Sequence, residues 1–220
     1  MGEFDRGFTL YVGNMFGGKT LNMIQDLNIA REILKRKIQV FKPCIDDRYS
    51  RDYISANEEK LKFPATEIEN AGDLEKLFLS TTEIVAIDEI QFLDKRVRDF
   101  IRDYKDKVKI IGTGLLRDYR GELFKLREIG DNKKDSELDM GNIIGLIDPL
   151  NPSDKISYRF PRCTESKNGD ICGRLAQYIQ RLEKEDGSFS PYEANTIITG
   201  GTNLYLPRCE KHFVKPERKV

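Results

Sequence analysis

The fold of this chain is decided by residues 13–20, which read Gly13-Asn14-Met15-Phe16-Gly17-Gly18-Lys19-Thr20. They fit the pattern G-x-x-x-x-G-K-[ST], in which glycines let successive backbone N–H groups converge on phosphate oxygens. An apolar, β-branched run at residues 8–12 precedes the motif, and apolar residues recur after it at roughly helical spacing. The motif therefore lies between a predicted strand and a predicted helix N-terminus, where free N–H groups and the helix dipole favour an anion.

The last two residues of the motif have expected roles. Lys19 would bridge the β- and γ-phosphates of a nucleotide, and Thr20 would ligate Mg²⁺. The alternative is a glycine-rich turn that fits the pattern by chance. The predicted strand and helix on either side of the motif disfavour this alternative.

Length and composition narrow the class of protein. The 220 residues suit one domain, or a main domain with a small appendage. Lys+Arg and Asp+Glu are balanced at 37 each, so no overall basic field would attract nucleic acid. No apolar run is long enough to span a bilayer, and the N-terminus MGEFDRG lacks the apolar region of a signal peptide. We therefore expect a cytoplasmic protein with no nucleic-acid or membrane partner.

The first 150 residues alternate between strand and helix patterns. Helices are predicted from Leu21 to about Lys37 and over 94–104, and strands over 38–42, 83–87 and 108–112. Residues 49–67 are polar and weakly periodic, which predicts mostly loop with a possible short strand. This alternation is typical of an α/β fold with a central parallel sheet.

Two carboxylates, Asp88 and Glu89, follow the near-continuous apolar run of 83–87. Such a run fits a strand that is covered on both faces of a parallel sheet. In phosphate-loop enzymes a strand ending in Asp delivers that carboxylate to the Mg²⁺ side of the nucleotide, so Asp88 is the expected metal ligand. Glu89 could then accept a proton from an attacking hydroxyl. The alternative is a charged turn with no chemistry.

The chain changes character after Gly130. Residues 131–137 are rich in charge, and shorter strand-like pieces follow at 156–160, 175–182 and 196–199. We therefore expect a nucleotide-binding domain at 1–150 and a small C-terminal domain at 156–220, with 131–155 as a charged insert and junction.

Four residues of the C-terminal region can ligate a metal: Cys163, Cys172, Cys209 and His212. Cys209-x-x-His212 supplies two ligands on one knuckle, and the two earlier cysteines, at a spacing wider than C-x-x-C, could supply the others for tetrahedral Zn²⁺. With four protein ligands and no position left for water, this site would be structural. The alternative is unrelated thiols and one surface histidine. Cys44 stands apart and is expected to be a small buried apolar residue.

Together these motifs resemble the type II thymidine kinase family, which combines a RecA-like P-loop domain with a small, β-rich, zinc-containing lasso domain. The matching residues occur in family order between residue 9 and about residue 212. They are Gly13 to Thr20, Asp46-Asp47-Arg48, Asp88-Glu89-Ile90-Gln91-Phe92, Gly114 through Phe124, Cys172-Gly173-Arg174, Gly200-Gly201 with Tyr205, and Cys209-Glu210-Lys211-His212.

The resemblance implies transfer of the γ-phosphoryl group from ATP·Mg²⁺ to the 5′-hydroxyl of thymidine or deoxyuridine. It implies that Glu89 is the general base and that Lys19 stabilises charge on the transferred group. It also implies a homotetramer and feedback inhibition by thymidine triphosphate.

The resemblance further implies two sets of binding residues, and it reverses the reading of Tyr119 and Phe124 as core aromatics that periodicity alone favours. The ATP and Mg²⁺ side comprises Gly13, Met15, Phe16, Gly17, Gly18, Lys19, Thr20, Asp46, Arg48, Asp88 and Gln91. The nucleoside side comprises Phe92, Leu116, Tyr119 and Phe124, with Thr196, Ile198, Thr199, Gly200 and Tyr205 from the lasso loop.

Two other classes of function remain open from the residues themselves. One is an ATP-hydrolysing, RecA-like ATPase in which Glu89 polarises water. The other is a non-catalytic nucleotide-binding switch or scaffold that zinc stabilises.

Overall fold

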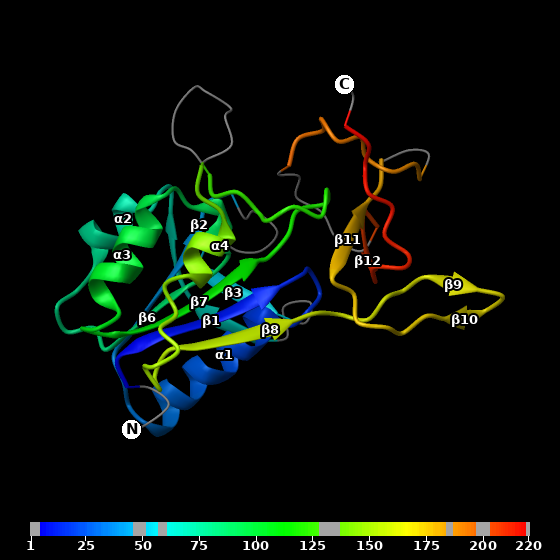
Figure 1. Ribbon diagram of the computed structural model, residues 1–220. Helices are drawn as coiled ribbons and strands as arrows, with labels where there is room; N and C mark the ends of the chain where they lie inside the picture. The colour runs from blue at the N-terminus through cyan, green and yellow to red at the C-terminus, as the bar shows by residue number, and fades with distance from the viewer. Residues whose placement is uncertain are drawn as a thin grey trace.

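The computed structural model describes residues 5–45, 52–56, 61–127, 137–183, 187–196 and 203–218. At its centre is a six-stranded sheet of order β5-β2-β6-β7-β1-β8, in which every pairing is parallel (Figure 1). The predicted α/β fold with a central parallel sheet is therefore confirmed. The strands of this sheet are β1 (Gly7–Gly13), β2 (Ile38–Pro43), β5 (Thr66–Ile68), β6 (Ile84–Ile87), β7 (Lys109–Leu115) and β8 (Lys155–Arg159).

Helices cover both faces of the sheet (Figure 1). Strand β6 shows this best, because Val85 and Ile87 join one buried core while Ile84 and Ala86 join the other. Burial on both faces explains why this strand is a continuous apolar run. Helix α1 (Lys19–Asn28) covers one face, and α2 (Gly72–Leu77), α3 (Arg96–Tyr104) and α4 (Met140–Ile144) cover the other.

Among the described residues, no helix has both the length and the apolar character needed to cross a bilayer.

The helix after the phosphate loop ends earlier than predicted. Helix α1 stops at Asn28 and continues as one π-helical turn, η1 (Ile29–Ile33). Lys35 then takes a left-handed conformation with φ of 55°, and the N–H of Arg36 bonds the carbonyl of Ala30 at 3.0 Å. This is the bonding of a left-handed C-terminal cap. The prediction of a helix to about Lys37 is therefore wrong at its C-terminal end: the helical part ends at Ile33, and the basic residues Lys35, Arg36 and Lys37 belong to the cap and the segment after it.

The region predicted to be mostly loop, residues 49–67, contains strands among its described residues. Strands β3 (Tyr53–Ala56) and β4 (Leu61–Pro64) pair antiparallel, and β5 extends the main sheet beside β2. Ile54 and Phe63 are buried in the same core as the apolar face of α1. These strands owe their stability to long-range packing, which local periodicity does not report.

Strand β8 extends the main sheet beyond the predicted junction. It pairs along β1 from Thr9 opposite Lys155 to Gly13 opposite Arg159. The start of the predicted C-terminal unit therefore belongs to the central sheet by its hydrogen bonds. We propose that the division into two domains falls after Arg159.

Beyond β8 the chain forms two small antiparallel pairs. Strands β9 (Ser166–Lys167) and β10 (Asp170–Ile171) make a hairpin that extends away from the rest of the molecule (Figure 1). This hairpin accounts for the wide spacing between Cys163 and Cys172. Strand β11 (Tyr178–Arg181) lies within the predicted strand 175–182 and pairs with β12 (Tyr205–Arg208). Most of the predicted strand 196–199, and residues 131–136 of the charged insert, lie outside the described residues.

The side chain of Asp154 joins the start of β1 to the turn that precedes β8. It is fully buried, and its carboxylate accepts hydrogen bonds from the N–H groups of Phe8 and Asp148, both at 2.8 Å. The ammonium of Lys105 donates to it at 2.7 Å. Burial raises the pKa of Asp154, but the hydrogen bonds from Lys105 and from the two N–H groups outweigh burial and leave the pKa below its ordinary value.

We expect Asp154→Asn to lower the free energy of unfolding by about 2–4 kcal/mol at pH 7, because it unpairs Lys105 and weakens the hydrogen bonds to Asp154. A carboxylate with a lowered folded-state pKa stabilises fully above its ordinary pKa of about 4 and progressively less as the pH falls through the folded value. Denaturant titrations of the wild type and Asp154→Asn should therefore give a constant difference in the free energy of unfolding from pH 7 to pH 5. That difference should shrink below pH 4. A difference at pH 3 as large as that at pH 7, or one equal to that of the surface variant Asp106→Asn, would contradict this.

Candidate active site

The loop between β1 and α1 has the conformation that its glycines allow. Gly18 caps α1 in the left-handed region with φ of 76°. At Gly17 a β-carbon would lie 2.3 Å from the carbonyl oxygen of Arg159, so no side chain fits there. The N–H of Asn14 donates to that same oxygen at 3.1 Å. The end of β8 therefore packs directly against the loop. This contact requires glycine at position 17, in addition to any requirement that phosphate binding imposes.

The polar residues at the start of α1 face the end of β6. The ammonium of Lys19 is buried and donates to the carbonyl of Asn14, within the loop, at 2.8 Å. The hydroxyl of Thr20 donates to Asp88 Oδ1 at 3.1 Å. The two oxygen ligands predicted for Mg²⁺ thus lie together, and hard oxygen ligands are those that Mg²⁺ prefers.

Thr113, a fully buried residue of β7, was not among the predicted site residues. Its hydroxyl donates to Asp88 and accepts the backbone N–H of Glu89 at 2.9 Å. Thr113 therefore orients both carboxylate residues. A hydroxyl inside an apolar strand that neighbours β6 was the available signal, but the strand was predicted to end at Gly112.

Glu89 is buried and held in an unfavourable backbone conformation, with φ of 49° and ψ of 52°. A non-glycine residue in this region costs roughly 1–3 kcal/mol and is typical of functional sites. The amide nitrogen of Gln91 donates to Glu89 Oε2 at 2.6 Å, and the Gln91 oxygen accepts the N–H of Leu115 at 2.9 Å. The second bond fixes the amide so that its NH₂ group faces Glu89. Gln91, predicted on the ATP side, is thus placed against the predicted base.

Three of the predicted nucleoside residues, Phe92, Leu116 and Phe124, form an apolar group that we call the apolar wall. Phe124 belongs to the main buried core, as the periodicity of the sequence favoured, and Phe92 and Leu116 are partly buried against that core. The rings of Phe92 and Phe124 meet edge to face, with centroids 5.9 Å apart. The N–H of Phe124 bonds the carbonyl of Leu116 at 3.0 Å, and the N–H of Phe92 bonds that of Glu89 at 3.0 Å. Phe92 of the apolar wall therefore lies one turn after Glu89, the predicted base.

Tyr119 lies under a segment that we call the strap, residues 187–196. It is buried, and its hydroxyl is 2.9 Å from the carbonyl oxygen of Pro191 and 2.8 Å from those of Tyr192 and Ala194. Burial raises the pKa of Tyr119, although two nearby arginines oppose the shift. Tyr119 therefore contacts the backbone of the strap, a contact that the sequence did not indicate.

The remaining predicted residues divide into those that the structure places near the loop or strap and those that lie outside the described residues. Met15 of the phosphate loop packs against a small cluster that contains Tyr205 and Ile179. The hydroxyl of Thr196 lies 3.5 Å from an Arg120 nitrogen, and Phe16 is 43% exposed. Outside the described residues lie Asp46, Arg48, Ile198, Thr199 and Gly200.

The predicted metal ligands converge. Within the described residues the ligand atoms of Cys163, Cys172, Cys209 and His212 all lie within 4.8 Å of one another. His212 Nδ1 is 3.5 Å from the sulfurs of Cys163 and Cys209, and the sulfurs of Cys172 and Cys209 are 3.9 Å apart. Tetrahedral zinc with its usual bond lengths would separate two sulfurs by about 3.8 Å and a sulfur from a nitrogen by about 3.6 Å. The donor set and its spacing fit zinc.

The cysteine cluster also contacts the phosphate loop through one residue. Ala176 packs against Cys163 and Cys209, and its carbonyl accepts a hydrogen bond from the Asn14 side chain at 2.9 Å. The cluster therefore supports a residue of the nucleotide-binding motif.

Comparison with known proteins gives a consistent result. A family model described as thymidine kinase matches residues 7–128. The thymidine kinase of Thermococcus kodakarensis is 31% identical over 212 residues, which cover 93% of this chain and 92% of that protein. The thymidine kinase of Mycoplasma capricolum is 27% identical over 217 residues, which cover 96% and 90% of the two chains. Both similarities extend well beyond the part that the family model matches.

Proposed function

Since this chain belongs to the thymidine kinase family, we propose that it transfers the γ-phosphoryl group of ATP to the 5′-hydroxyl of thymidine or deoxyuridine. The proposal rests mainly on the different partners of the two carboxylates that follow β6. There Asp88 bonds Thr20 of the phosphate loop, while the adjacent Glu89 is held by Gln91 beside the apolar wall. The two carboxylates thus face different partners, one on the donor side and one on the acceptor side.

On the donor side, the loop N–H groups and Lys19 bind the β- and γ-phosphates. Thr20 and Asp88 would hold Mg²⁺, which neutralises charge on the phosphate oxygens when it is bound. Met15 and Phe16 complete the loop, and we propose that Asp46 and Arg48 contribute from beyond β2. Phosphoryl transfer depends mainly on positioning and electrostatics, which these residues supply.

On the acceptor side, Glu89 accepts the proton of the 5′-hydroxyl as that oxygen attacks the γ-phosphorus, while the bond from the γ-phosphorus to the β–γ bridging oxygen breaks and ADP leaves. Gln91 and Thr113 keep the glutamate in place through its carboxylate and its backbone N–H. The apolar wall would bury the pyrimidine, and Thr196, Ile198, Thr199, Gly200 and Tyr205 would contribute the other side of the nucleoside site.

The C-terminal cluster is proposed to bind one structural zinc ion through its four protein ligands. A closed site of this kind leaves no position for substrate. The zinc would stabilise a region whose own buried core is small, since the cluster itself contains only Cys163, Ala176 and Cys209 as buried residues among those described.

Transfer of labelled γ-phosphate from ATP·Mg²⁺ tests the function. Thymidine and deoxyuridine are expected to give labelled monophosphates, whereas deoxycytidine and a reaction without nucleoside serve as controls. Labelled free phosphate with no labelled nucleotide would favour the ATPase, and no turnover in zinc-replete protein would favour the switch.

The family resemblance also supports three proposals about the whole protein: a homotetramer, feedback inhibition by thymidine triphosphate and a cytoplasmic location. Light scattering of the purified protein tests the first, and inhibition that thymidine relieves tests the second. Fractionation of the source cells tests the third.

A further inference from the structure

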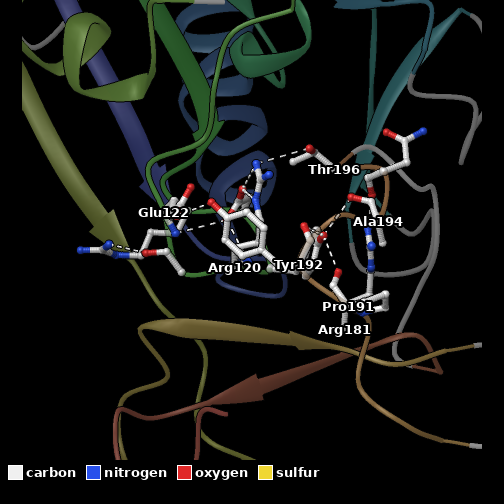
Figure 2. Close-up of polar contacts among 12 residues, drawn as sticks. Arg120, Glu122, Arg181, Pro191, Tyr192, Ala194 and Thr196 are labelled. Carbon is white, nitrogen blue, oxygen red and sulfur yellow. Dashed lines mark hydrogen bonds and ion pairs between the residues drawn. The ribbon is translucent and has the colours of Figure 1, made fainter. Parts of the chain in front are cut away.

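Three side chains of the loop after β7, those of Tyr119, Arg120 and Glu122, form hydrogen bonds with residues 191–196 of the strap (Figure 2). The hydroxyl of Tyr192 donates to Glu122 at 2.8 Å, and the hydroxyl of Tyr119 reaches strap carbonyls as described above. Arg120 pairs with Asp118 at 2.6 Å and lies 3.5 Å from the hydroxyl of Thr196. The loop that carries Leu116 and Phe124 of the apolar wall is therefore also the loop on which the strap rests.

Arg181, at the end of β11, contacts both Tyr119 and the strap. Its guanidinium carbon lies 3.7 Å from the centre of the Tyr119 ring. Its Nε donates to the hydroxyl of Ser190 at 2.9 Å, and its Nη1 donates to the carbonyl of Asn195. One side chain thus contacts Tyr119 and grips the strap at two points five residues apart in sequence.

Packing alone does not explain an arginine at this position. Arg181 is 1% exposed, and among the described residues no carboxylate pairs with it. A buried cation is costly unless hydrogen bonds or an aromatic face compensate for lost hydration. An aliphatic residue would fill the same space without that cost. What only the arginine provides is a set of directional bonds between Tyr119 and the strap.

We propose that Arg181 is a positioning residue for the nucleoside: through Tyr119 and the strap it holds Thr196 and the apolar wall in the arrangement that binds the acceptor. The inference rests on the proposed function and goes beyond it, because Arg181 belongs to none of the motifs that indicate the family. It places the effect of Arg181 on the acceptor, with the phosphate loop unaffected.

The kinetic test compares two variants of Arg181. Arg181→Met keeps much of the length but removes the bonds, and we expect the KM for thymidine to rise about tenfold, as the loss of roughly one net hydrogen bond would produce. The KM for ATP and kcat should change less than about twofold. Arg181→Lys keeps a cation over the ring and one donor, so it should recover part of the affinity. Arg31→Met is the matched control, because Arg31 lies 4.5 Å from the ring centre of Phe63 on the other face of the sheet.

A second variant keeps the proposal testable if Arg181→Met fails to fold. Tyr119→Phe removes only the hydroxyl that faces the strap carbonyls, and it should also raise the thymidine KM selectively. Tyr104→Phe, in α3, removes a hydroxyl far from the strap and should leave that constant unchanged. An unchanged thymidine KM in Tyr119→Phe, or equal effects on the KM for ATP, would overturn the positioning role.

Hydrogen exchange without any nucleoside separates this inference from the proposed function. The amides of 187–196 should exchange faster in Arg181→Met, or in Tyr119→Phe, than in the wild type, whereas those of β11 and β12 should not. If the wild type phosphorylates no nucleoside, the proposed function fails, and with it the role in acceptor binding. Even in that case, faster exchange of the 187–196 amides in the variants would show that Arg181 holds the strap. Exchange equal to that of the wild type would overturn this structural role too.

Discussion

Glu89→Gln is expected to reduce kcat for thymidine phosphorylation by about a hundredfold or more, the scale of general-base catalysis. Glutamine has the same shape, and its amide oxygen can still accept the hydrogen bond that Gln91 donates at 2.6 Å in the wild type. The β-carbon is retained, so the unfavourable backbone conformation is the same in both proteins. The change therefore removes the proton acceptor while it preserves the surroundings.

Steady-state kinetics and calorimetry together check this expectation. Binding of Mg²⁺-ATP should be nearly unchanged, because the proposal assigns the donor side to Asp88 and Thr20 and not to Glu89. Glu75→Gln, at a position in α2 away from the site, is the matched control and should retain wild-type turnover. Near-normal turnover of Glu89→Gln would remove its role as the base and return Glu89 to a structural role in the turn after β6.

Cys209→Ser is expected to abolish stoichiometric zinc binding and to lower the melting temperature by on the order of 10 °C. Metal binding energy contributes directly to folding in small zinc sites, and about 3 kcal/mol corresponds to that shift for a chain of this size. Activity should fall as well, because Ala176 packs against Cys209 and bonds Asn14 of the phosphate loop. If the cluster binds zinc as proposed, loss of the metal would loosen the support of Asn14 in the phosphate loop.

Elemental analysis and thermal denaturation of the same samples provide the check. The wild type should contain about one zinc per chain, and chelation should reproduce the lowered melting temperature. Cys44→Ser is the control, since Cys44 lies outside the cluster, and it should keep both zinc and stability. A well-folded, metal-free wild type, or a Cys209→Ser protein of unchanged stability, would rule out the structural zinc.

Local sequence patterns predicted those strands of the main sheet whose residues are almost all buried. Strands β1, β2, β6 and β7 were all expected, because residues buried on both faces leave continuous apolar runs in the sequence. The phosphate loop was predicted from its G-x-x-x-x-G-K-[ST] motif, and the two carboxylates after β6 from their place directly after such an apolar run. Strands β3, β4 and β5 lie in or at the end of a region for which the sequence indicated one possible short strand at most. Their buried residues, such as Ile54, owe their burial to packing on α1 and leave no continuous apolar run.

Four features could therefore be predicted from the sequence: the α/β fold, the phosphate loop, the adjacent pair Asp88 and Glu89, and the cluster of three cysteines and one histidine. These features depend on residue type at fixed local spacing. Three features became visible only in the folded chain: β8 joins the central sheet, Thr113 and Gln91 bond Glu89, and Arg181 contacts both Tyr119 and the strap. Those contacts join residues from separate elements, and some are far apart in the chain. Their partners are therefore chosen by packing and hydrogen bonding in three dimensions, which no local pattern records.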